Sequence, residues 1–198
     1  MPEHRTQQKG LRLRLAVLDE AQRRRVYNEH MKEDFPPSEL KSLELIEQGI
    51  AEGYYRFLGL LDHNEVIGYV CLVEAEDVCL IDYLAVIPGR RSSGAGSELL
   101  RLLENRLNDK EYVIIEAELP DSGRDADETA LRKRRVEFYL RNGILDTGID
   151  VRCFGVDFRI LEAGTHGPHQ RQDVIRRYEN VYRRILPEKL FRDNIHTD

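Results

Sequence analysis

The sequence predicts one compact domain of mixed α/β (α+β) type, in which helices flank a central, mostly antiparallel sheet. Three observations support this prediction. The chain has 198 residues, which is enough for one sizeable core. Several short runs alternate apolar and polar residues at a period of two, whereas others repeat at the period of a helix. Consecutive strand-like runs in the middle of the chain are joined by very short polar connections, which favour antiparallel neighbours.

The first quarter of the chain is expected to form a strand followed by two helices. Residues 11–15 alternate leucine with arginine, which is typical of a half-buried strand, and an arginine-rich segment of helical character follows. The run Phe35-Pro36-Pro37 ends this helix, and Ser38 is a favourable N-cap for the next one. The apolar face of the second helix is formed by Leu40, Leu43 and Ile46.

Three strands and a third helix are expected next. Residues 54–61, 66–73 and 78–86 have the composition of strands and form the antiparallel meander. The third strand leads through a loop rich in glycine and serine into a strongly amphipathic helix. The apolar face of that helix is formed by Leu99, Leu100, Leu103 and Leu107.

The remainder of the chain continues the alternation of strands and helices. Residues 112–119 indicate a buried strand, and residues 128–142 indicate a helix that Gly143 terminates. Two further strands are expected at 144–153 and 155–161, so that the strand, helix, strand passage places two strands in parallel. A C-terminal helix follows, because four apolar residues recur at helical spacing: Val174, Tyr178, Val181 and Ile185.

Composition and charge argue against several classes of protein. The net charge of −6 argues against binding nucleic acid through its phosphates, which requires an excess of lysine and arginine. Apolar runs fall well short of the roughly 20 residues that span a bilayer, so no membrane association is expected. Residues 1–9 lack the apolar stretch of a secretory signal. We therefore expect a cytoplasmic protein.

The cysteines and histidines do not suggest a metal site. Cys71, Cys79 and Cys153 lie in segments rich in valine, leucine and isoleucine and lack CxxC spacing, which indicates buried, reduced thiols. His166 and His169 lie in a loop with glycine and proline, without the nearby carboxylates or cysteines of a metal site. No metal is therefore expected.

The loop between the third strand of the meander and the following helix can bind an anion. In the pattern Arg91-x-x-Gly94-x-Gly96, glycines let backbone N–H groups converge on one point, where the helix dipole adds positive charge. A pyrophosphate suits that point. The loop lacks the Gly-Lys-Ser/Thr of a P-loop and the third glycine of GxGxxG.

Two motifs together resemble the GNAT superfamily of N-acetyltransferases. The stretch Leu84-Ala85-Val86-Ile87-Pro88-Gly89-Arg90-Arg91-Ser92-Ser93-Gly94-Ala95-Gly96 resembles its acetyl-CoA-binding motif. The stretch Phe138-Tyr139-Leu140-Arg141-Asn142-Gly143-Ile144 is similar to its second signature. The order of the elements agrees over residues 11–161. The resemblance implies a GNAT-like domain at 1–163 and a helical extension at 164–198 packed on it.

The resemblance implies an acetyl-CoA-dependent N-acetyltransferase that acylates a primary amine by direct transfer. Tyr139 would protonate the departing thiolate, and a backbone N–H near Leu84–Val86, freed by a bulge, would polarise the thioester carbonyl. Family members often carry an asparagine after the fifth strand to contact pantetheine, but residues 120–127 contain none. The implied acetyl-CoA-binding residues are Leu84, Ala85, Val86, Arg91, Ser92, Ser93, Gly94, Ala95, Gly96, Ser97 and Tyr139.

Two carboxylates are candidates for the base that takes the proton of the amine. Glu116 occupies the strand position that bears the catalytic carboxylate in the family's ribosomal-protein N-terminal acetyltransferases, and Glu118 points the same way. Asp82 lies within an otherwise apolar strand, either as a base with a raised pKa or in an ion pair with an arginine. The sequence leaves both open.

The acceptor is expected to be cationic, because acidic residues are expected near the cleft: Glu74, Glu76, Asp82, Glu116 and Glu118. The C-terminal helix either covers the acceptor cleft or forms the interface of a homodimer. The alternative function is that of a non-catalytic domain that binds CoA or acyl-CoA for regulation or interaction. The sequence leaves these alternatives open.

Overall fold

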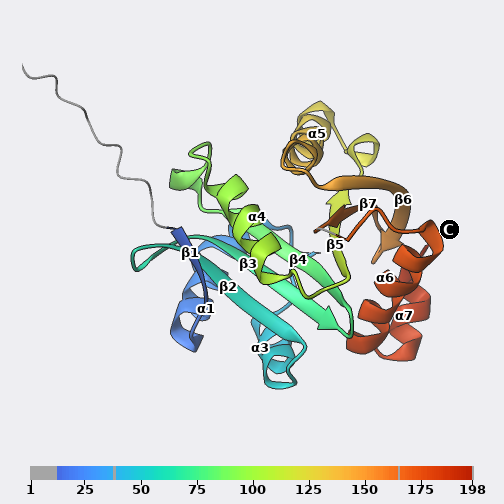
Figure 1. Ribbon diagram of the computed structural model, residues 1–198, viewed down its shortest axis with the longest axis horizontal. Coiled ribbons are helices and arrows are strands. Elements are labelled where there is room, and N and C mark those ends of the chain that lie inside the picture. The colour runs from blue at the N-terminus through green and yellow to red at the C-terminus, as the bar shows by residue number, and fades with distance from the viewer. Residues whose placement is uncertain (1–12, 38, 165, 198) are drawn as a thin grey trace, which may run out of the picture.

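A computed structural model describes residues 13–37, 39–164 and 166–197, in which helices flank a single central sheet (Figure 1). The strands are β1 (Leu13–Val17), β2 (Tyr55–Asp62), β3 (Glu65–Ala75), β4 (Val78–Val86), β5 (Tyr112–Glu118), β6 (Leu145–Cys153), β7 (Val156–Ala163) and β8 (Ile195–His196). The α-helices are α1 (Glu20–Val26), α2 (Lys32–Asp34), α3 (Leu43–Ala51), α4 (Ala95–Arg106), α5 (Ala126–Arg141), α6 (Arg171–Ile185) and α7 (Glu188–Asn194). A π-helical turn at Tyr27–Met31 joins α1 to α2.

The strands follow the order β1-β2-β3-β4-β5-β7-β6-β8 across the sheet. All neighbouring pairs are antiparallel except β4 and β5, which run parallel on either side of the α4 crossover. Strands β5 and β6 also point the same way, with β7 inserted between them. The predicted fold class, a mixed and mostly antiparallel sheet flanked by helices, is confirmed.

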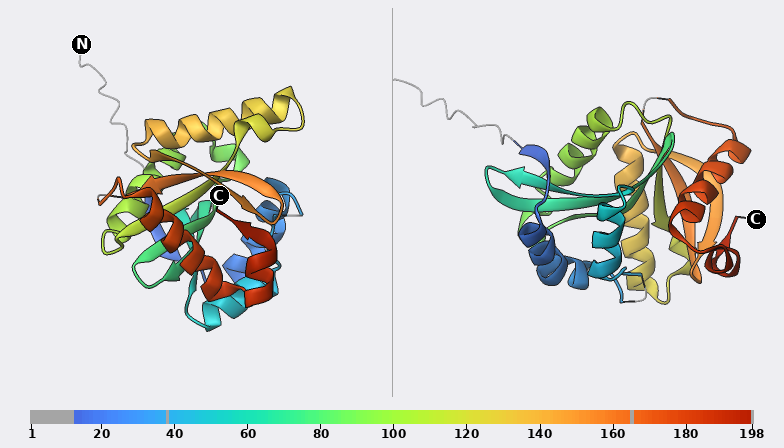
Figure 2. Two further views of the ribbon diagram at one scale, coloured as in Figure 1. Left: turned by 90° about the vertical axis from the view of Figure 1, so that its right-hand side faces the viewer. Right: turned by 90° about the horizontal axis from the view of Figure 1, so that it is seen from below.

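Each face of the sheet buries its own apolar core. Helices α4 and α5 cover one face, where the leucines predicted for α4 are buried. Helices α1 and α3 cover the other face together with α6 (Figure 2). Val174, Tyr178 and Val181 of α6 enter the same core as Ile46 of α3. The C-terminal segment thus lies on the face opposite α4 and α5.

Two helical predictions need correction. Helix α3 begins at Leu43, where the Ser42 side chain accepts a hydrogen bond from the Leu45 N–H at 3.4 Å. Ser38, the predicted N-cap, lies outside the described residues. A distant residue holds the chain before α3: the Tyr83 hydroxyl accepts from the Lys41 N–H at 2.9 Å and donates to the Glu39 carbonyl at 2.7 Å.

The C-terminal segment contains more than the single predicted helix. Helix α6 ends before Pro187, whose ring cannot continue a helix, and α7 and the short strand β8 follow. Strand β8 pairs with β6 through Cys153 and Ile195.

The three cysteines are free and buried, as predicted. No helix in the described part of the chain is long and apolar enough to cross a membrane.

Candidate active site

Strands β4 and β5 separate in the middle of the sheet. Their parallel ladder runs from Val78 and Tyr112 to Ile81 and Ile115, and stops there. Both strands continue, β4 to Val86 and β5 to Glu118, and β5 turns away from β4 (Figure 1). The edges that face each other beyond this rung lack a ladder among the described residues. Backbone groups of β4 are therefore available to a ligand between the strands.

A β-bulge lies at the point where the two strands separate. The register between β3 and β4 shifts there, so that Asp82 has no partner between Ile81 and Tyr83. Asp82 and Tyr83 consequently both face the side of α3 and α6, whereas Ile81 and Leu84 pack on the side of α4 and α5. The bulge expected near Leu84–Val86 is present in β4 and lies at Asp82, just before these residues, which themselves pair regularly with β3.

The glycine loop leads from β4 into the N-terminus of α4. Gly94 caps the helix with a φ of 86°, a left-handed conformation that glycine adopts without strain. A Cβ on Gly96 would lie 3.1 Å from Cζ of Phe138, so glycine here lets α5 approach α4 closely. The two predicted motifs thus contact each other directly.

Arg91 fixes the loop to its surroundings. Its Nε donates to the Val86 carbonyl at 2.9 Å, and its Nη2 contacts Oδ1 of Asp34 at 2.6 Å. Tyr69 donates to the other oxygen of Asp34 at 2.7 Å. Burial and this carboxylate raise the pKa of Tyr69, so the phenol remains a donor. The loop is therefore held in place by β3, β4 and α2.

A groove of about 480 Å³ opens beside this loop, between α4 and the end of α5. Gly94 and Ser97 line one end, and Asn108 at the far end of α4 lines the other. Asn142, Gly143 and nearby residues form the opposite wall. The volume is within the usual range for cofactor sites.

Tyr139 lies on the same face of the sheet as the groove. Its side chain is 9% exposed and packs in the core beneath α4 and α5, with its ring 5.4 Å from that of Phe138. Burial raises the pKa of Tyr139 to about 12, an effect that the nearby charge of Arg135 opposes. Within the described residues its hydroxyl has no hydrogen-bond partner. Tyr139 is thus a neutral phenol with a free donor.

Asp82 lies on the opposite face, in an ion pair with a lysine. Its Oδ1 is 2.7 Å from Nζ of Lys41, and its Oδ2 accepts from the Tyr55 hydroxyl at 2.5 Å. Only 4% of the Asp82 side chain is exposed. Burial would lower the pKa of Lys41, but Asp82 and Tyr83 outweigh it and raise the pKa above its usual value. Both oxygens of Asp82 are therefore occupied.

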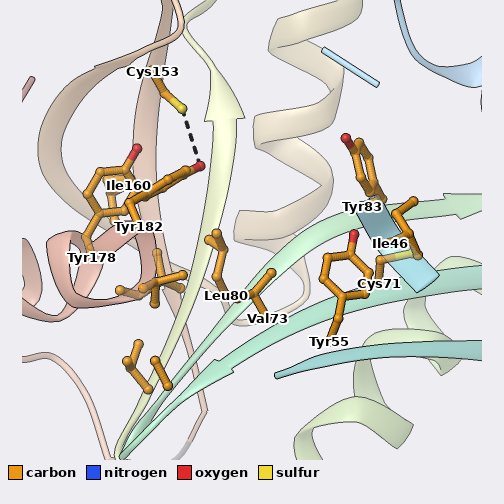
Figure 3. Packing of buried hydrophobic residues seen from close by; sticks show 14 of the residues in the cluster. Ile46, Tyr55, Cys71, Val73, Leu80, Tyr83, Cys153, Ile160, Tyr178 and Tyr182 are labelled. Atoms are coloured by element: carbon orange, nitrogen blue, oxygen red, sulfur yellow. Dashed lines mark hydrogen bonds between the residues drawn. The ribbon is translucent and has the colours of Figure 1, made fainter. Parts of the chain in front are cut away.

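Glu116 lies on the same face as Asp82, directly after the last rung of the β4–β5 ladder. Its Oε1 accepts from the hydroxyls of Tyr178 at 2.6 Å and Tyr182 at 2.8 Å, and its Oε2 accepts from Tyr182 at 3.0 Å. Figure 3 shows both tyrosines on α6, with the thiol of Cys153 3.3 Å from the Tyr182 hydroxyl. Burial raises the pKa of Glu116, and the two tyrosines oppose that rise.

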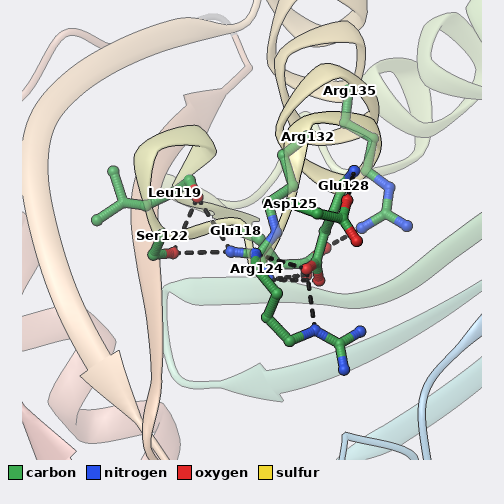
Figure 4. Close-up of polar contacts among 8 residues, drawn as sticks. All are labelled: Glu118, Leu119, Ser122, Arg124, Asp125, Glu128, Arg132 and Arg135. Atoms are coloured by element: carbon green, nitrogen blue, oxygen red, sulfur yellow. Dashed lines mark hydrogen bonds and ion pairs between the residues drawn. The ribbon is translucent and has the colours of Figure 1, made fainter.

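Glu118, one strand period further, belongs to an arginine cluster (Figure 4). It contacts Arg135 and, at 3.1 Å, Arg132. Arg132 also donates to the Leu119 carbonyl at 3.1 Å and to the Ser122 hydroxyl at 2.7 Å. The segment after β5 that lacks the family asparagine is thus held by this buried arginine. Glu118 is fully compensated by positive charge.

Glu74 and Glu76 lie away from this site. They belong to the β3–β4 hairpin, next to the paired end of β4, and Glu74 contacts Arg56 at 3.1 Å. The expectation that they line the cleft is wrong, because the cleft opens at the other end of β4. His169 of the C-terminal loop also lies away from this site, since it contacts Glu162 and, at 3.2 Å, Glu111. No group of side chains in the described residues has the composition of a metal site.

Sequence reasoning missed four side chains that surround the two carboxylates. Tyr178 and Tyr182 are spaced as core residues of a helix, and their helical spacing concealed their polar role. Tyr55 begins the mostly apolar strand β2, where it has the pattern of a core residue, and Lys41 lies in a connection without a motif. Only the packing of α6 and of the chain before α3 brings them to β4 and β5.

The glycine loop, the opening between β4 and β5 and Tyr139 lie in the same part of the fold. The sequence model of the acetyltransferase (GNAT) family matches residues 23–130, more than half of the chain. The chain belongs to this family, whose members are N-acetyltransferases. The predicted family and the predicted enzyme class are thereby confirmed.

Solved structures share this fold. An acetyltransferase of the GNAT family from Bacteroides thetaiotaomicron has a TM-score of 0.71 at 21% identity, over 88% of this chain and 99% of the other. The ribosomal-protein-S18-alanine N-acetyltransferase of Escherichia coli has a TM-score of 0.55 at 15% identity, over 80% and 98%. The aminoglycoside 6'-N-acetyltransferase of Enterococcus faecium has a TM-score of 0.54 at 16% identity, over 79% and 98%. An aminoglycoside 6'-N-acetyltransferase complexed with coenzyme A gives the same values. No curated protein matches the sequence.

Proposed function

We propose that the protein transfers the acetyl group of acetyl-CoA to a primary amine by direct attack within the opening between β4 and β5. One observation carries the proposal. Tyr139 lies on the α4–α5 face of the sheet and Glu116 on the α3–α6 face, beyond the last β4–β5 rung. A thioester entering from one side can therefore meet an amine entering from the other.

The CoA half of the site is assigned to the glycine loop. The pyrophosphate would bind the backbone N–H groups at the start of α4, where the helix dipole favours anions. The loop residues proposed for this role are Arg91, Ser92, Ser93, Gly94, Ala95, Gly96 and Ser97. Leu84, Ala85 and Val86 offer the free edge of β4 to the pantetheine arm and the thioester carbonyl.

Glu116 is the proposed base. A primary amine has a pKa of about 10.4 and reaches the site protonated, so a carboxylate must take a proton before attack. Of the carboxylates at the opening, Asp82 is neutralised by Lys41 and Glu118 by Arg132 and Arg135. Glu116 has no cation within salt-bridge distance in the described residues, and a raised pKa suits a base. Asp82 is the alternative base, which Lys41 would first have to release.

Tyr139 is the proposed acid. The amine nitrogen bonds to the carbonyl carbon, the carbon–sulfur bond breaks, and the sulfur takes the phenolic proton. The ammonium gives one proton to Glu116 before attack, and the nitrogen loses its second proton to solvent as the amide forms. Glu116 then releases its proton to solvent, and the phenol regains one from solvent. A pKa of about 12 keeps Tyr139 protonated in the resting enzyme, ready to donate.

The proposed acceptor is a singly charged cationic amine, of a small molecule or a protein. The uncompensated Glu116 supplies one negative charge on the acceptor side, whereas its carboxylate neighbours are neutralised by cations. The related enzymes named above modify a protein alanine and an aminoglycoside, so the fold accommodates amines of both kinds.

A second candidate is a CoA-binding domain without turnover. It is favoured by the hydrogen bonds that already occupy both carboxylates of the acceptor side. Release of CoA thiol from acetyl-CoA, measured with singly charged, polycationic and neutral amines, distinguishes the candidates. We expect acceptor-dependent release that is fastest with singly charged amines. Submillimolar binding of acetyl-CoA without release by any amine would contradict the proposed transferase and favour the second candidate.

A further inference from the structure

Helix α6 lies beyond the part of the chain that matches the family model, yet it packs against β3, β4 and β5 beside the proposed base. We propose that α6 completes the acceptor half of the active site, with Tyr178 and Tyr182 as positioning residues for Glu116. This inference rests on the proposed function. It assigns the C-terminal extension a part in the reaction.

The two tyrosines hold the Glu116 carboxylate from adjacent turns of α6. They are four residues apart, so they lie one turn above each other on α6, with their rings 5.0 Å apart. Tyr178 is 1% exposed and Tyr182 is 3% exposed. Both hydroxyls contact the Glu116 carboxylate, at 2.6, 2.8 and 3.0 Å. A buried phenol requires a partner for its hydroxyl, and a buried carboxylate requires donors. Each requirement is met by the other group.

The chemistry of the donors separates Glu116 from its neighbours. A lysine or arginine that holds a carboxylate also neutralises it, as Lys41 does for Asp82 and Arg132 for Glu118. A phenol orients the carboxylate and leaves its charge in place. Tyrosine donors therefore hold a carboxylate rigidly while leaving it able to attract an ammonium group and accept its proton.

The other groups that face this carboxylate do not replace the tyrosines. The charge of Asp82 on β4 disfavours ionisation of Glu116. Lys41, whose ammonium group is hydrogen-bonded to Asp82, favours that ionisation but lies farther from Glu116 than the two tyrosine hydroxyls. Cys153 on β6 reaches it only through Tyr182, to whose hydroxyl it donates. In the described residues, direct hydrogen bonds to the Glu116 carboxylate come from α6 alone.

The test is the pH profile of kcat/KM for Tyr178→Phe, Tyr182→Phe and the double variant. Phenylalanine keeps the ring and removes one donor to the ionised carboxylate. Because hydrogen bonds to the ionised form lower the pKa of a carboxyl, their loss raises it. We expect the acid limb of the profile to move up by about one pH unit in the double variant, with kcat/KM at neutral pH falling about tenfold.

Two controls keep this result specific. Tyr112→Phe removes a hydroxyl from the opposite end of β5, where none of the described residues hydrogen-bonds to it, and should leave the profile unchanged. In a Glu116→Gln background the two substitutions on α6 should have no further effect, because the group that they position has lost its function. Thermal unfolding checks that each variant is folded at the assay temperature.

The outcomes separate this inference from the proposed function. If Glu116→Gln abolishes turnover but the tyrosine variants keep the wild-type profile, the positioning role is contradicted and the transferase stands. If the tyrosine substitutions lower kcat/KM by the same factor in the Glu116→Gln background as in the wild-type background, α6 acts only through stability. The inference is then again contradicted. Absence of amine-dependent thiol release in the wild-type chain contradicts the proposed function itself.

Discussion

The two faces of the sheet at the opening between β4 and β5 are built from different kinds of sequence. On the α4–α5 face, the loop from Arg91 to Gly96 is continuous, and Gly96 contacts Phe138, the neighbour of Tyr139. On the α3–α6 face, the side chains around Asp82 and Glu116 come from segments up to 66 residues away in the chain. A contiguous motif can be recognised locally, but an assembled site can be read only from the fold.

The difference extends to electrostatics. The α4–α5 face offers backbone N–H groups and one neutral phenol, which suit the phosphates and thiolate of CoA. At the opening, the α3–α6 face carries Asp82, Glu116 and Glu118, of which Asp82 and Glu118 are neutralised by basic side chains. The comparison predicts that substitutions in the glycine loop of the first face change CoA affinity, whereas substitutions of the proposed base on the second face and of the proposed acid Tyr139 change turnover.

The largest effect is expected on the second face, from Glu116→Gln. Loss of a general base typically lowers the rate by a factor of about 100 or more. We therefore expect kcat/KM for the amine to fall by about that factor, with the Kd for acetyl-CoA unchanged. Glu111→Gln, at the exposed position directly before the same strand, serves as the matched control. Steady-state kinetics and calorimetry check both variants. Weaker acetyl-CoA binding by Glu116→Gln would contradict the claim that Glu116 acts in turnover and not in CoA binding.

The next effect concerns stability, through Lys41→Met. Removing one partner of a buried ion pair leaves the other charge uncompensated, although Lys41 keeps 30% of its side chain exposed, which reduces the cost. We expect the free energy of unfolding in urea to fall by about 2 kcal/mol. Arg24→Met removes an exposed ion pair with Glu20 and should change the free energy of unfolding by less than about 0.5 kcal/mol. Equal losses in the free energy of unfolding would contradict a stabilising ion pair between Lys41 and Asp82. Asp82 would then again be a candidate for an unpaired base.

A smaller effect is expected on the first face, from Gly94→Ala. An alanine at a φ of 86° costs about 1 to 2 kcal/mol, so the loop would abandon the conformation that aims its N–H groups. We expect the Kd for acetyl-CoA to rise about tenfold. Gly53→Ala introduces the same strain at a φ of 82° in a turn remote from the site. It should lower stability without changing the Kd, and a similar change in Kd for both would contradict a specific role of the loop.

Most of the fold and half of the site could be predicted from the sequence. The apolar runs of β2, β3 and β4 and the leucines of α4 determine their burial directly, and Gly94 and Tyr139 belong to local motifs. The start of α3 could not be predicted, because the chain before it is held by Tyr83 of β4, whose hydroxyl accepts from the Lys41 N–H and donates to the Glu39 carbonyl. Asp82 was expected to pair with an arginine if it paired at all. Its partner is a lysine that only the chain before α3 delivers.

The most direct measurement of the central claim is the release of CoA thiol by Tyr139→Phe, with acetyl-CoA saturating and Tyr112→Phe as the control. The account places Tyr139 at the thioester from the face opposite Glu116, as the acid for the departing sulfur. It predicts that turnover falls at least about tenfold in Tyr139→Phe while the Kd for acetyl-CoA holds. Wild-type turnover in Tyr139→Phe, with a suitable amine, would contradict the arrangement of acid and base across the opening.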